Sequence, residues 1–174
     1  IYSSIVAASG ISVVWFIQPY FNQAGLPLKF FGVAWAILQF ATAIFSFYAH
    51  RIESFLGKRI SLFSLIFLTA VGYFLVGKTL SLGTAAFFLI FNFVRGINNP
   101  VTKDYINQLI PSEIRATVLS IRSLVARLIF SVLGPILGWI ADAYTIQTAL
   151  MVSGAIFLIT GIISLMFLYK HKVI

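Results

Sequence analysis

Apolar residues fill six long stretches of this sequence, and short polar segments separate them. Each stretch holds close to the ~20 residues that a helix needs to cross the hydrocarbon core of a bilayer. Strands exposed to lipid would leave backbone groups without hydrogen bonds, so the stretches predict helices. We therefore expect an all-α polytopic membrane protein in which residues 1–174 form a single six-helix bundle. The expected transmembrane helices are residues 1–20, 30–49, 59–77, 80–105, 114–141 and 145–169.

Glycine and proline mark the connections between these stretches. Gly25 and Pro27 interrupt the pattern after the first stretch, and Gly57 interrupts it after the second. Pro111 precedes the fifth stretch, in keeping with the preference of proline for the start of a helix. The connection at residues 141–145 is very short. It predicts that the fifth and sixth helices are antiparallel neighbours.

Polar residues recur on one face of the second, fourth and fifth spans and, less regularly, in the first. Residues three, four, seven or eleven positions apart share a helical face. The polar positions are Ser9, Ser12 and Gln18; Trp35, Gln39, Thr42 and Ser46; Asn92, Arg95, Asn99 and Lys103; and Ser120, Ser123, Arg127, Ser131, Gly134 and Gly138. In lipid, such faces turn toward a protein interior or a water-filled cavity. We expect these four spans to line a cavity and the third and sixth to face lipid, as a 3+3 inverted repeat inferred from hydropathy.

The composition is that of a membrane protein. Hydrophobic residues make up 60% of the chain and charged residues 9%, with a mean hydropathy of +1.03. Soluble domains carry about 25% charged residues. A net charge of +8 would suggest nucleic acid in a soluble protein, but here the cations lie at span ends, so no nucleic-acid partner is expected. The chain has no cysteine, which excludes thiolate metal sites, and we expect neither a metal nor a cofactor.

The distribution of cations predicts the orientation in the membrane. Seven of the lysines and arginines lie on one side of the predicted bundle, whereas Lys29 and Lys78 lie on the opposite side. The seven are Arg51, Lys58 and Arg59 in the 50–59 segment, Lys103 and Arg115 in or next to the 102–114 segment, and Lys170 and Lys172 in the C-terminus. Cytoplasmic loops are enriched in Lys and Arg, so both segments and the C-terminus are expected in the cytoplasm. Aromatic residues are expected at the two boundaries, namely Trp15, Tyr20, Trp139 and Tyr144 outside and Tyr48 and Tyr169 inside.

Three segments resemble the C-terminal half of a major facilitator superfamily transporter. Residues 18–35, which hold QPYF, AGLP and FGVAW, resemble the seventh and eighth helices of that family. The segment 49–59 resembles a degraded copy of the cytoplasmic signature G-x-x-x-D-R-x-G-R-R, without the leading glycine and with the aspartate either missing or replaced by Glu53. Residues 110–120, leading to GPILG at 134–138, resemble the tenth loop and eleventh helix.

This resemblance implies a carrier of twelve helices in two six-helix bundles that works by alternating access. The chain would be the C-terminal bundle, and its start at Ile1 agrees with a missing N-terminal six-helix half. The partners are then the lipid bilayer, a small-molecule solute and that other half. Similarity to bacterial permeases and exporters implies the bacterial inner membrane. In the family, the first, second, fourth and fifth helices of each half face the cavity.

A small set of polar residues is expected to line the substrate cavity: Gln18, Trp35, Gln39, Asn92, Arg95 and Arg127. Arg127 lies midway along the fifth span, where a charge costs at least about 2.5–3.5 kcal/mol on insertion scales. A guanidinium that meets substrate favours a carboxylate, a phosphate or an aromatic face. The alternative role of the arginine and the amides is hydrogen bonding between helices. Arg122, on the other side of the same span, is expected to extend to the inner surface.

A cytoplasmic gate is expected around Glu53, with Arg51, Arg59 and Arg115 nearby. The hypothesis pairs Glu53 with Arg95 or Arg115, because the chain holds only four acidic residues and Glu53 lies at the matching depth.

Small residues and a proline in the fifth span predict a packing site. Gly134-x-x-x-Gly138, with Pro135, favours close helix packing and a kink, with a flexing gate as the alternative.

These features favour secondary active transport of a small organic solute. No carboxylate lies midway along a span, so this half offers no proton carrier and leaves the coupling ion open. Catalysis is not expected, because His50 and His171 both lie near a membrane boundary and no Ser and Asp share a workable depth. The alternative function is a channel or a homo-oligomeric assembly, although the sequence contains no carbonyl filter motif or acidic ring.

Overall fold

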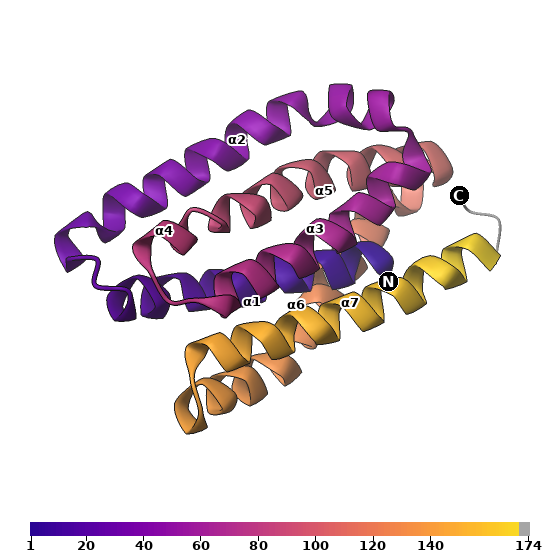
Figure 1. Cartoon of the computed structure of the whole chain (residues 1–174). Coiled ribbons are helices and arrows are strands. Elements are labelled where there is room, and N and C mark those ends of the chain that lie inside the picture. The colour runs from indigo at the N-terminus through magenta and orange to yellow at the C-terminus, as the bar shows by residue number, and fades with distance from the viewer. Residues whose placement is uncertain (171–174) are drawn as a thin grey trace.

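The computed structural model describes residues 1–170, apart from the side chain of Leu109, and its regular elements are all helices (Figure 1). His171 and Lys172, part of the predicted cytoplasmic C-terminus, lie outside the described residues. Six helices have 21 residues or more, and two further elements are short. The elements are α1 (Tyr2–Gln23), η1 (Leu28–Phe30), α2 (Phe31–Leu56), α3 (Lys58–Lys78), α4 (Leu82–Ala85), α5 (Phe88–Leu109), α6 (Ser112–Ala143) and α7 (Ile146–Lys170). The predicted all-α class is confirmed.

Five of the long helices are apolar enough to cross a membrane, namely α1, α2 with η1, α3, α6 and α7. The fourth predicted span is the exception, and its bounds were wrong. The chain first forms the short helix α4, because the Ser81 side chain accepts a hydrogen bond from the backbone N–H of Thr84. Helix α5 then begins at Phe88 rather than at residue 80. Its many polar side chains, from Asn92 to Gln108, leave it outside the set of helices apolar enough to cross a membrane by hydropathy alone.

The second helix is longer than predicted, because polar residues do not end it. Helix α2 continues to Leu56, beyond the expected end at residue 49, and Gly57 alone separates it from α3. Gly57 has a φ of +76° and a ψ of 160°, an extended part of the left-handed region that essentially only glycine adopts. Its N–H donates to the Glu53 carbonyl at 2.8 Å. The segment expected to form a cytoplasmic loop is therefore mostly helix.

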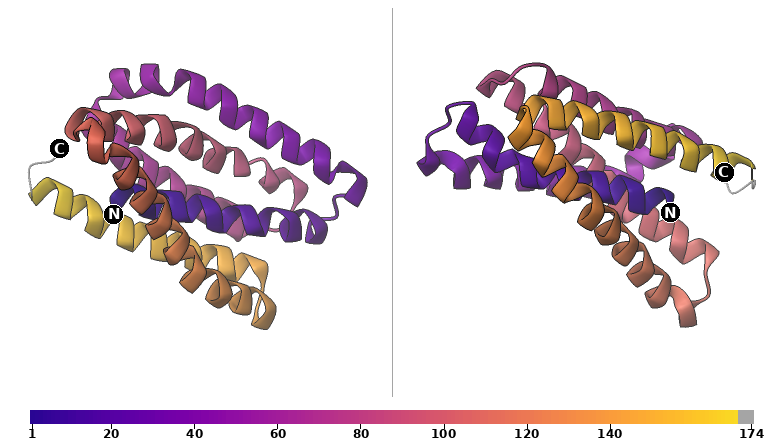
Figure 2. Two further views of the ribbon diagram at one scale, coloured as in Figure 1. Left: turned by 180° about the vertical axis from the view of Figure 1, so that it is seen from behind. Right: turned by 90° about the horizontal axis from the view of Figure 1, so that it is seen from below.

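Two pairs of helices pack closely, and glycines make the approach possible. Helix α3 lies along α7, where a Cβ at Gly77, Gly154 or Gly161 would lie 2.7–2.9 Å from a side-chain atom of the facing helix. Helix α2 lies along α5, where Gly96 meets the α2 backbone. Small residues let helices approach in this way in membranes. Helix α1 packs among α3, α5, α6 and α7, and α6 runs obliquely across it (Figure 2).

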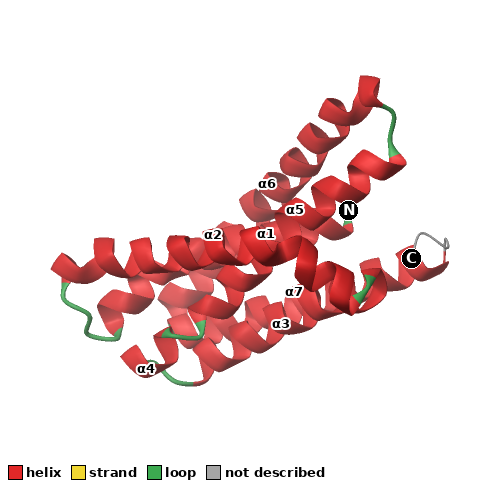
Figure 3. Cartoon of the chain, turned by 90° about the horizontal axis from the view of Figure 1, so that it is seen from above, coloured by secondary structure: helices red, strands yellow, loops and turns green. Residues whose placement is uncertain are grey.

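The ends of the helices gather on two sides of the bundle. The start of α1, the end of α7 and the α2–α3 and α5–α6 connections share one end, while α4 and the other connections lie at the opposite end (Figures 1 and 3). The third helix of each triplet, α3 or α7, packs against the other.

Tyr20 does not sit at a lipid boundary as predicted. It is fully buried, and its hydroxyl hydrogen-bonds the Thr79 carbonyl at 2.9 Å and the Thr84 hydroxyl at 2.6 Å. It therefore ties α1 to the connection between α3 and α5. The other boundary aromatics are exposed, namely Trp15, Tyr48, Trp139, Tyr144 and Tyr169.

Candidate functional site

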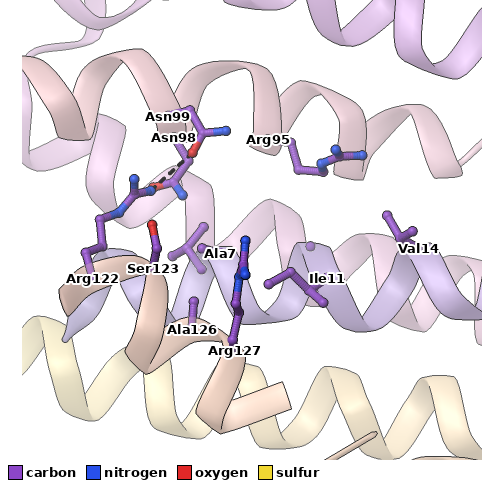
Figure 4. Close-up of a pocket in the computed structure, with 12 residues that line it drawn as sticks. Ala7, Ile11, Val14, Arg95, Asn98, Asn99, Arg122, Ser123, Ala126 and Arg127 are labelled. Carbon is purple, nitrogen blue, oxygen red and sulfur yellow. Dashed lines mark hydrogen bonds between the residues drawn. The ribbon is translucent and has the colours of Figure 1, made fainter. Parts of the chain in front are cut away.

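A cavity of about 350 Å³ lies between α1, α5 and α6. Its residues come from three helices that the chain order separates, and Figure 4 shows them around a common space. The lining consists of Val6, Ala7, Gly10, Ile11 and Val14 from α1, Arg95, Asn98 and Asn99 from α5, and Arg122, Ser123, Ala126 and Arg127 from α6. Helices α2, α3 and α7 contribute no residue to this lining, so three of the four spans that were predicted to line a cavity do so, and the second does not.

The walls of the cavity differ in polarity. Helix α1 supplies an apolar wall with a glycine in it, whereas α5 and α6 supply amides, a hydroxyl and guanidinium groups. A Cβ at Gly10 would lie 3.0 Å from Cγ of Arg95, so the glycine leaves room for the aliphatic part of that arginine. The polar faces predicted for the fourth and fifth spans thus meet across the cavity.

Three arginines share this cavity, and few protein groups engage them. Arg95 donates from Nη1 to Oε1 of Gln39 over a long 3.4 Å, and Arg122 donates from Nη2 to Oδ1 of Asn99 at 3.2 Å. The Nε atom of Arg122 is buried and has no hydrogen-bond partner. Arg127 extends from the middle of α6 toward α1 (Figure 4), and within residues 1–170 it makes no hydrogen bond. No aspartate or glutamate lines the cavity.

The six predicted cavity residues separate into three groups: those at this cavity, those at a separate space, and Asn92, which lies in a helix contact. Arg95 and Arg127 line the cavity, and Gln39 borders it through its contact with Arg95. Gln18 and Trp35 instead line a separate space of about 180 Å³ between the end of α1 and the start of α2.

Asn92 lies away from this cavity, in the contact between α2 and α5. It is 2% exposed, and its Oδ1 accepts from the Thr42 hydroxyl at 2.7 Å while its Nδ2 donates to the Phe88 carbonyl at 2.8 Å. Those bonds satisfy its polar atoms, so Asn92 performs the alternative role of joining helices.

Two polar residues of this site, Arg122 and Asn98, were not predicted, and neither was the apolar face of α1. Ser9 and Ser12, on the predicted polar face of α1, are buried and donate to the Val6 and Ala8 carbonyls of their own helix. Arg122 was expected to extend to the inner surface, but it points into the cavity, because its long side chain reaches around α6 to Asn99. Asn98, one position outside the predicted polar face of α5, also lines the cavity and accepts from Thr102 at 3.1 Å. The small side chains of Ser123 and Ala126 could have indicated the cavity from the sequence, since they leave space beside α6 between Arg122 and Arg127.

The predicted pairing at the cytoplasmic end does not occur in this structure. Glu53 accepts a hydrogen bond from the Tyr105 hydroxyl, and within residues 1–170 no ion pair joins it to Arg95 or Arg115. Arg95 lies ten positions before Tyr105, roughly 15 Å along α5, and cannot reach Glu53. Arg115 is occupied elsewhere, because it donates to the carbonyls of Asn107 and Ile110 at 2.9 and 3.2 Å.

The other two expected gate residues point to separate aromatic rings. The guanidinium of Arg51 lies 5.9 Å from the ring centre of Tyr48, and that of Arg59 lies 5.8 Å from the ring centre of Tyr169. Neither contact involves Glu53.

Gly134 and Gly138 do not form the predicted packing site. A Cβ at Gly138 would meet nothing within 4 Å, and one at Gly134 would meet only the Phe130 ring of its own helix. Both glycines line a second cavity of about 280 Å³ between α1 and α6. Trp15 of α1 stacks on Phe130 there, with ring centres 6.0 Å apart. Pro135 lies inside α6, which continues to Ala143.

Within residues 1–170, no group of three His, Asp or Glu side chains could hold a metal ion.

Comparison with known proteins gives the family. No curated protein matches the chain. The model of the family described as Major Facilitator Superfamily matches residues 1–173, which is nearly the whole sequence. The chain therefore belongs to the Major Facilitator Superfamily, a family of membrane transporters rather than enzymes.

Proposed function

We propose that this chain is the C-terminal six-helix half of a secondary carrier that moves a small organic solute by alternating access. The observation that carries the proposal is the arginine-lined cavity between α1, α5 and α6. Its helices are the first, fourth and fifth long helices of the chain, and the second borders it through Gln39. The third and sixth stay outside, which agrees with the arrangement implied by the family resemblance.

The proposed partner is a second six-helix half, which covers the open side of this cavity. Helices α2 and α6, at the two sides of α1 and α5, leave most of their length uncovered. Large apolar side chains on them are exposed, for example Phe40 and Phe47 on α2 and Leu128 and Val132 on α6. A bundle that must meet both lipid and another bundle needs such surfaces.

The proposed orientation places the chain ends and the α2–α3 and α5–α6 connections in the cytoplasm of a bacterial cell. The cations of the described residues support it, because most of them gather at this end. They are Arg51, Lys58, Arg59, Lys103, Arg115 and Lys170, whereas Lys29 and Lys78 lie at the other end. An excess of Lys and Arg marks the cytoplasmic side of short loops.

The packing suggests which parts move together. The α2–α5 pair is joined by the close approach at Gly96, the Thr42–Asn92 bond and the Glu53–Tyr105 bond. Two cavities, of about 350 and 280 Å³, instead lie along the boundary between α1 and α6, whereas a space of about 390 Å³ with an almost wholly apolar lining lies against α3 and α7. We expect the solute to bind along the α1–α6 boundary, because its larger cavity carries the polar side chains, while the α2–α5 and α3–α7 pairs move as units.

Reconstitution tests the proposal. The natural protein that carries this chain is purified into proteoliposomes, and labelled solutes are screened for counterflow. Saturable uptake that internal solute accelerates supports a carrier, whereas a current proportional to voltage supports a channel and contradicts the proposal. The isolated chain should be inactive without a partner half, so robust counterflow by a monomeric six-helix chain would contradict the two-bundle mechanism.

A further inference from the structure

We propose that the cavity between α1, α5 and α6 binds a multivalent organic anion, a small compound with two or more carboxylate or phosphate groups. Arg95, Arg122 and Arg127 would be its binding residues. The inference rests on the proposed function, because it names the solute class that the same cavity receives.

The charge balance of the cavity is the first argument. Three guanidinium groups line it, and no carboxylate does. The acidic residues of the chain lie elsewhere: Glu53 bonds to Tyr105, Asp104 to Gln108, Glu113 to Ser112, and Asp142 lines the second cavity. Like charges that share a small space repel one another. A monovalent anion would balance only one of the three positive charges, so a multivalent anion matches the site better.

The unused hydrogen-bond donors are the second argument. Arg127 makes no hydrogen bond within the described residues, the Nε atom of Arg122 is buried without a partner, and Arg95 makes only a 3.4 Å contact. A guanidinium presents its donors as a planar fork that matches a carboxylate or a phosphate. Within residues 1–170, protein groups therefore leave most of these donors available.

Size and polarity make the ligand a small organic molecule. The cavity of about 350 Å³ is at the lower end of the range for ligand sites. Ala7, Ile11 and Val14 of α1 face the arginines, and this apolar wall suits a carbon skeleton between charged groups.

Equilibrium binding tests the inference without requiring transport. The natural protein in nanodiscs of zwitterionic lipid is titrated with radiolabelled citrate and pyrophosphate, and with acetate, glucose and choline, all at one ionic strength. We expect citrate or pyrophosphate to bind at least about 10-fold more tightly than acetate, with no binding of glucose or choline. Arg127→Gln, Arg122→Gln and Arg95→Gln should each weaken binding about 10- to 100-fold, the usual range for a charge-assisted hydrogen bond.

Two further variants control for charge and for folding. Lys29→Gln removes the same charge from the surface far from the cavity and should leave affinity unchanged. Arg127→Lys keeps the charge but loses the fork, so its affinity should lie between those of the wild type and Arg127→Gln. If the glutamine variants do not fold, the affinity of the wild type must still fall steeply as salt rises, because multivalent charges bind at the site.

The outcomes separate this inference from the proposed function. Multivalent anions that bind no better than acetate, or arginine variants that bind them like the wild type, overturn the inference. Anion binding without counterflow leaves the inference intact and contradicts the proposed function. Counterflow of a neutral or cationic solute without anion binding supports the proposed function and overturns the inference.

Discussion

The close contact between α2 and α5 at Gly96 gives the sharpest test of the packing. A Cβ at this glycine would lie 2.7 Å from Cβ of Phe45, 2.9 Å from the Thr42 carbonyl oxygen and 3.1 Å from the Ser46 nitrogen. Two of these atoms belong to the α2 backbone and cannot rotate away. Because carbon atoms pack at about 3.5–4.0 Å, Gly96→Ala must push the helices apart by on the order of 1 Å.

The expected cost follows from this overlap. Adding a methylene group to a tightly packed interior costs about 1–3 kcal/mol. Alanine also favours a helix over glycine by about 1 kcal/mol, which would hide part of the loss. Gly138→Ala removes this ambiguity, because Gly138 is also inside a helix but a Cβ there meets nothing within 4 Å. The difference in free energy of unfolding between the two variants should therefore be about 1–3 kcal/mol, with Gly96→Ala the less stable.

Unfolding in mixed micelles measures this difference. Each variant is titrated with sodium dodecyl sulfate, and circular dichroism and tryptophan fluorescence follow the transition to give the free energy of unfolding. Equal stabilities of Gly96→Ala and Gly138→Ala would refute the close approach of α2 and α5. A Gly138→Ala variant much less stable than the wild type would show instead that α6 packs against a neighbour there.

Three more substitutions test other contacts by the same unfolding assay. Tyr20→Phe removes the hydroxyl that bonds the Thr79 carbonyl, so the free energy of unfolding should fall by about 1 kcal/mol. Asn92→Ala and Thr42→Ala, combined in a double-mutant cycle, should show a coupling of about 0.6 kcal/mol, because their hydrogen bond joins two helices. Gly57→Ala forces alanine into a φ of +76° with a ψ of 160° and should cost about 1–3 kcal/mol.

Each of these substitutions has a result that contradicts the structure. An unchanged Tyr20→Phe protein would mean that α1 is not tied to the α3–α5 connection. Additive effects of Asn92→Ala and Thr42→Ala would place these side chains apart. A neutral Gly57→Ala would mean that the α2–α3 connection lacks left-handed geometry; Gly32→Ala, in a regular and open part of α2, is its control.

Hydropathy predicted the number and order of the long helices. Polar groups are costly in lipid, so each membrane span must coincide with an apolar stretch of the sequence. It did not locate the end of α2, since the polar residues from His50 to Ser54 are compatible with a helix and only Gly57 ends it. It also missed α4, a short helix that depends on one Ser81 side chain.

The candidate site could be predicted only in part. Arg95 and Arg127 were identifiable because a charge within a membrane span is costly, but the place of Arg122 was not, since helical phase does not limit the reach of an arginine. Asn92 and Gly138 fit their predicted patterns and serve other roles. A polar or small residue in a membrane span indicates either a cavity or a close helix contact. The residues of the facing helix determine which of the two forms.

Cysteine accessibility tests most directly whether the cavity between α1, α5 and α6 is a wetted solute route. The chain has no native cysteine, so single substitutions can be read without background. Ser123→Cys lies in the cavity lining, and Ile159→Cys lies on the exposed face of α7. In membranes containing the natural protein, we predict that an impermeant, negatively charged thiosulfonate modifies Ser123→Cys much faster than Ile159→Cys, and that a transported solute slows only the former. Equal rates for the two variants, or no protection by solute, would contradict the account.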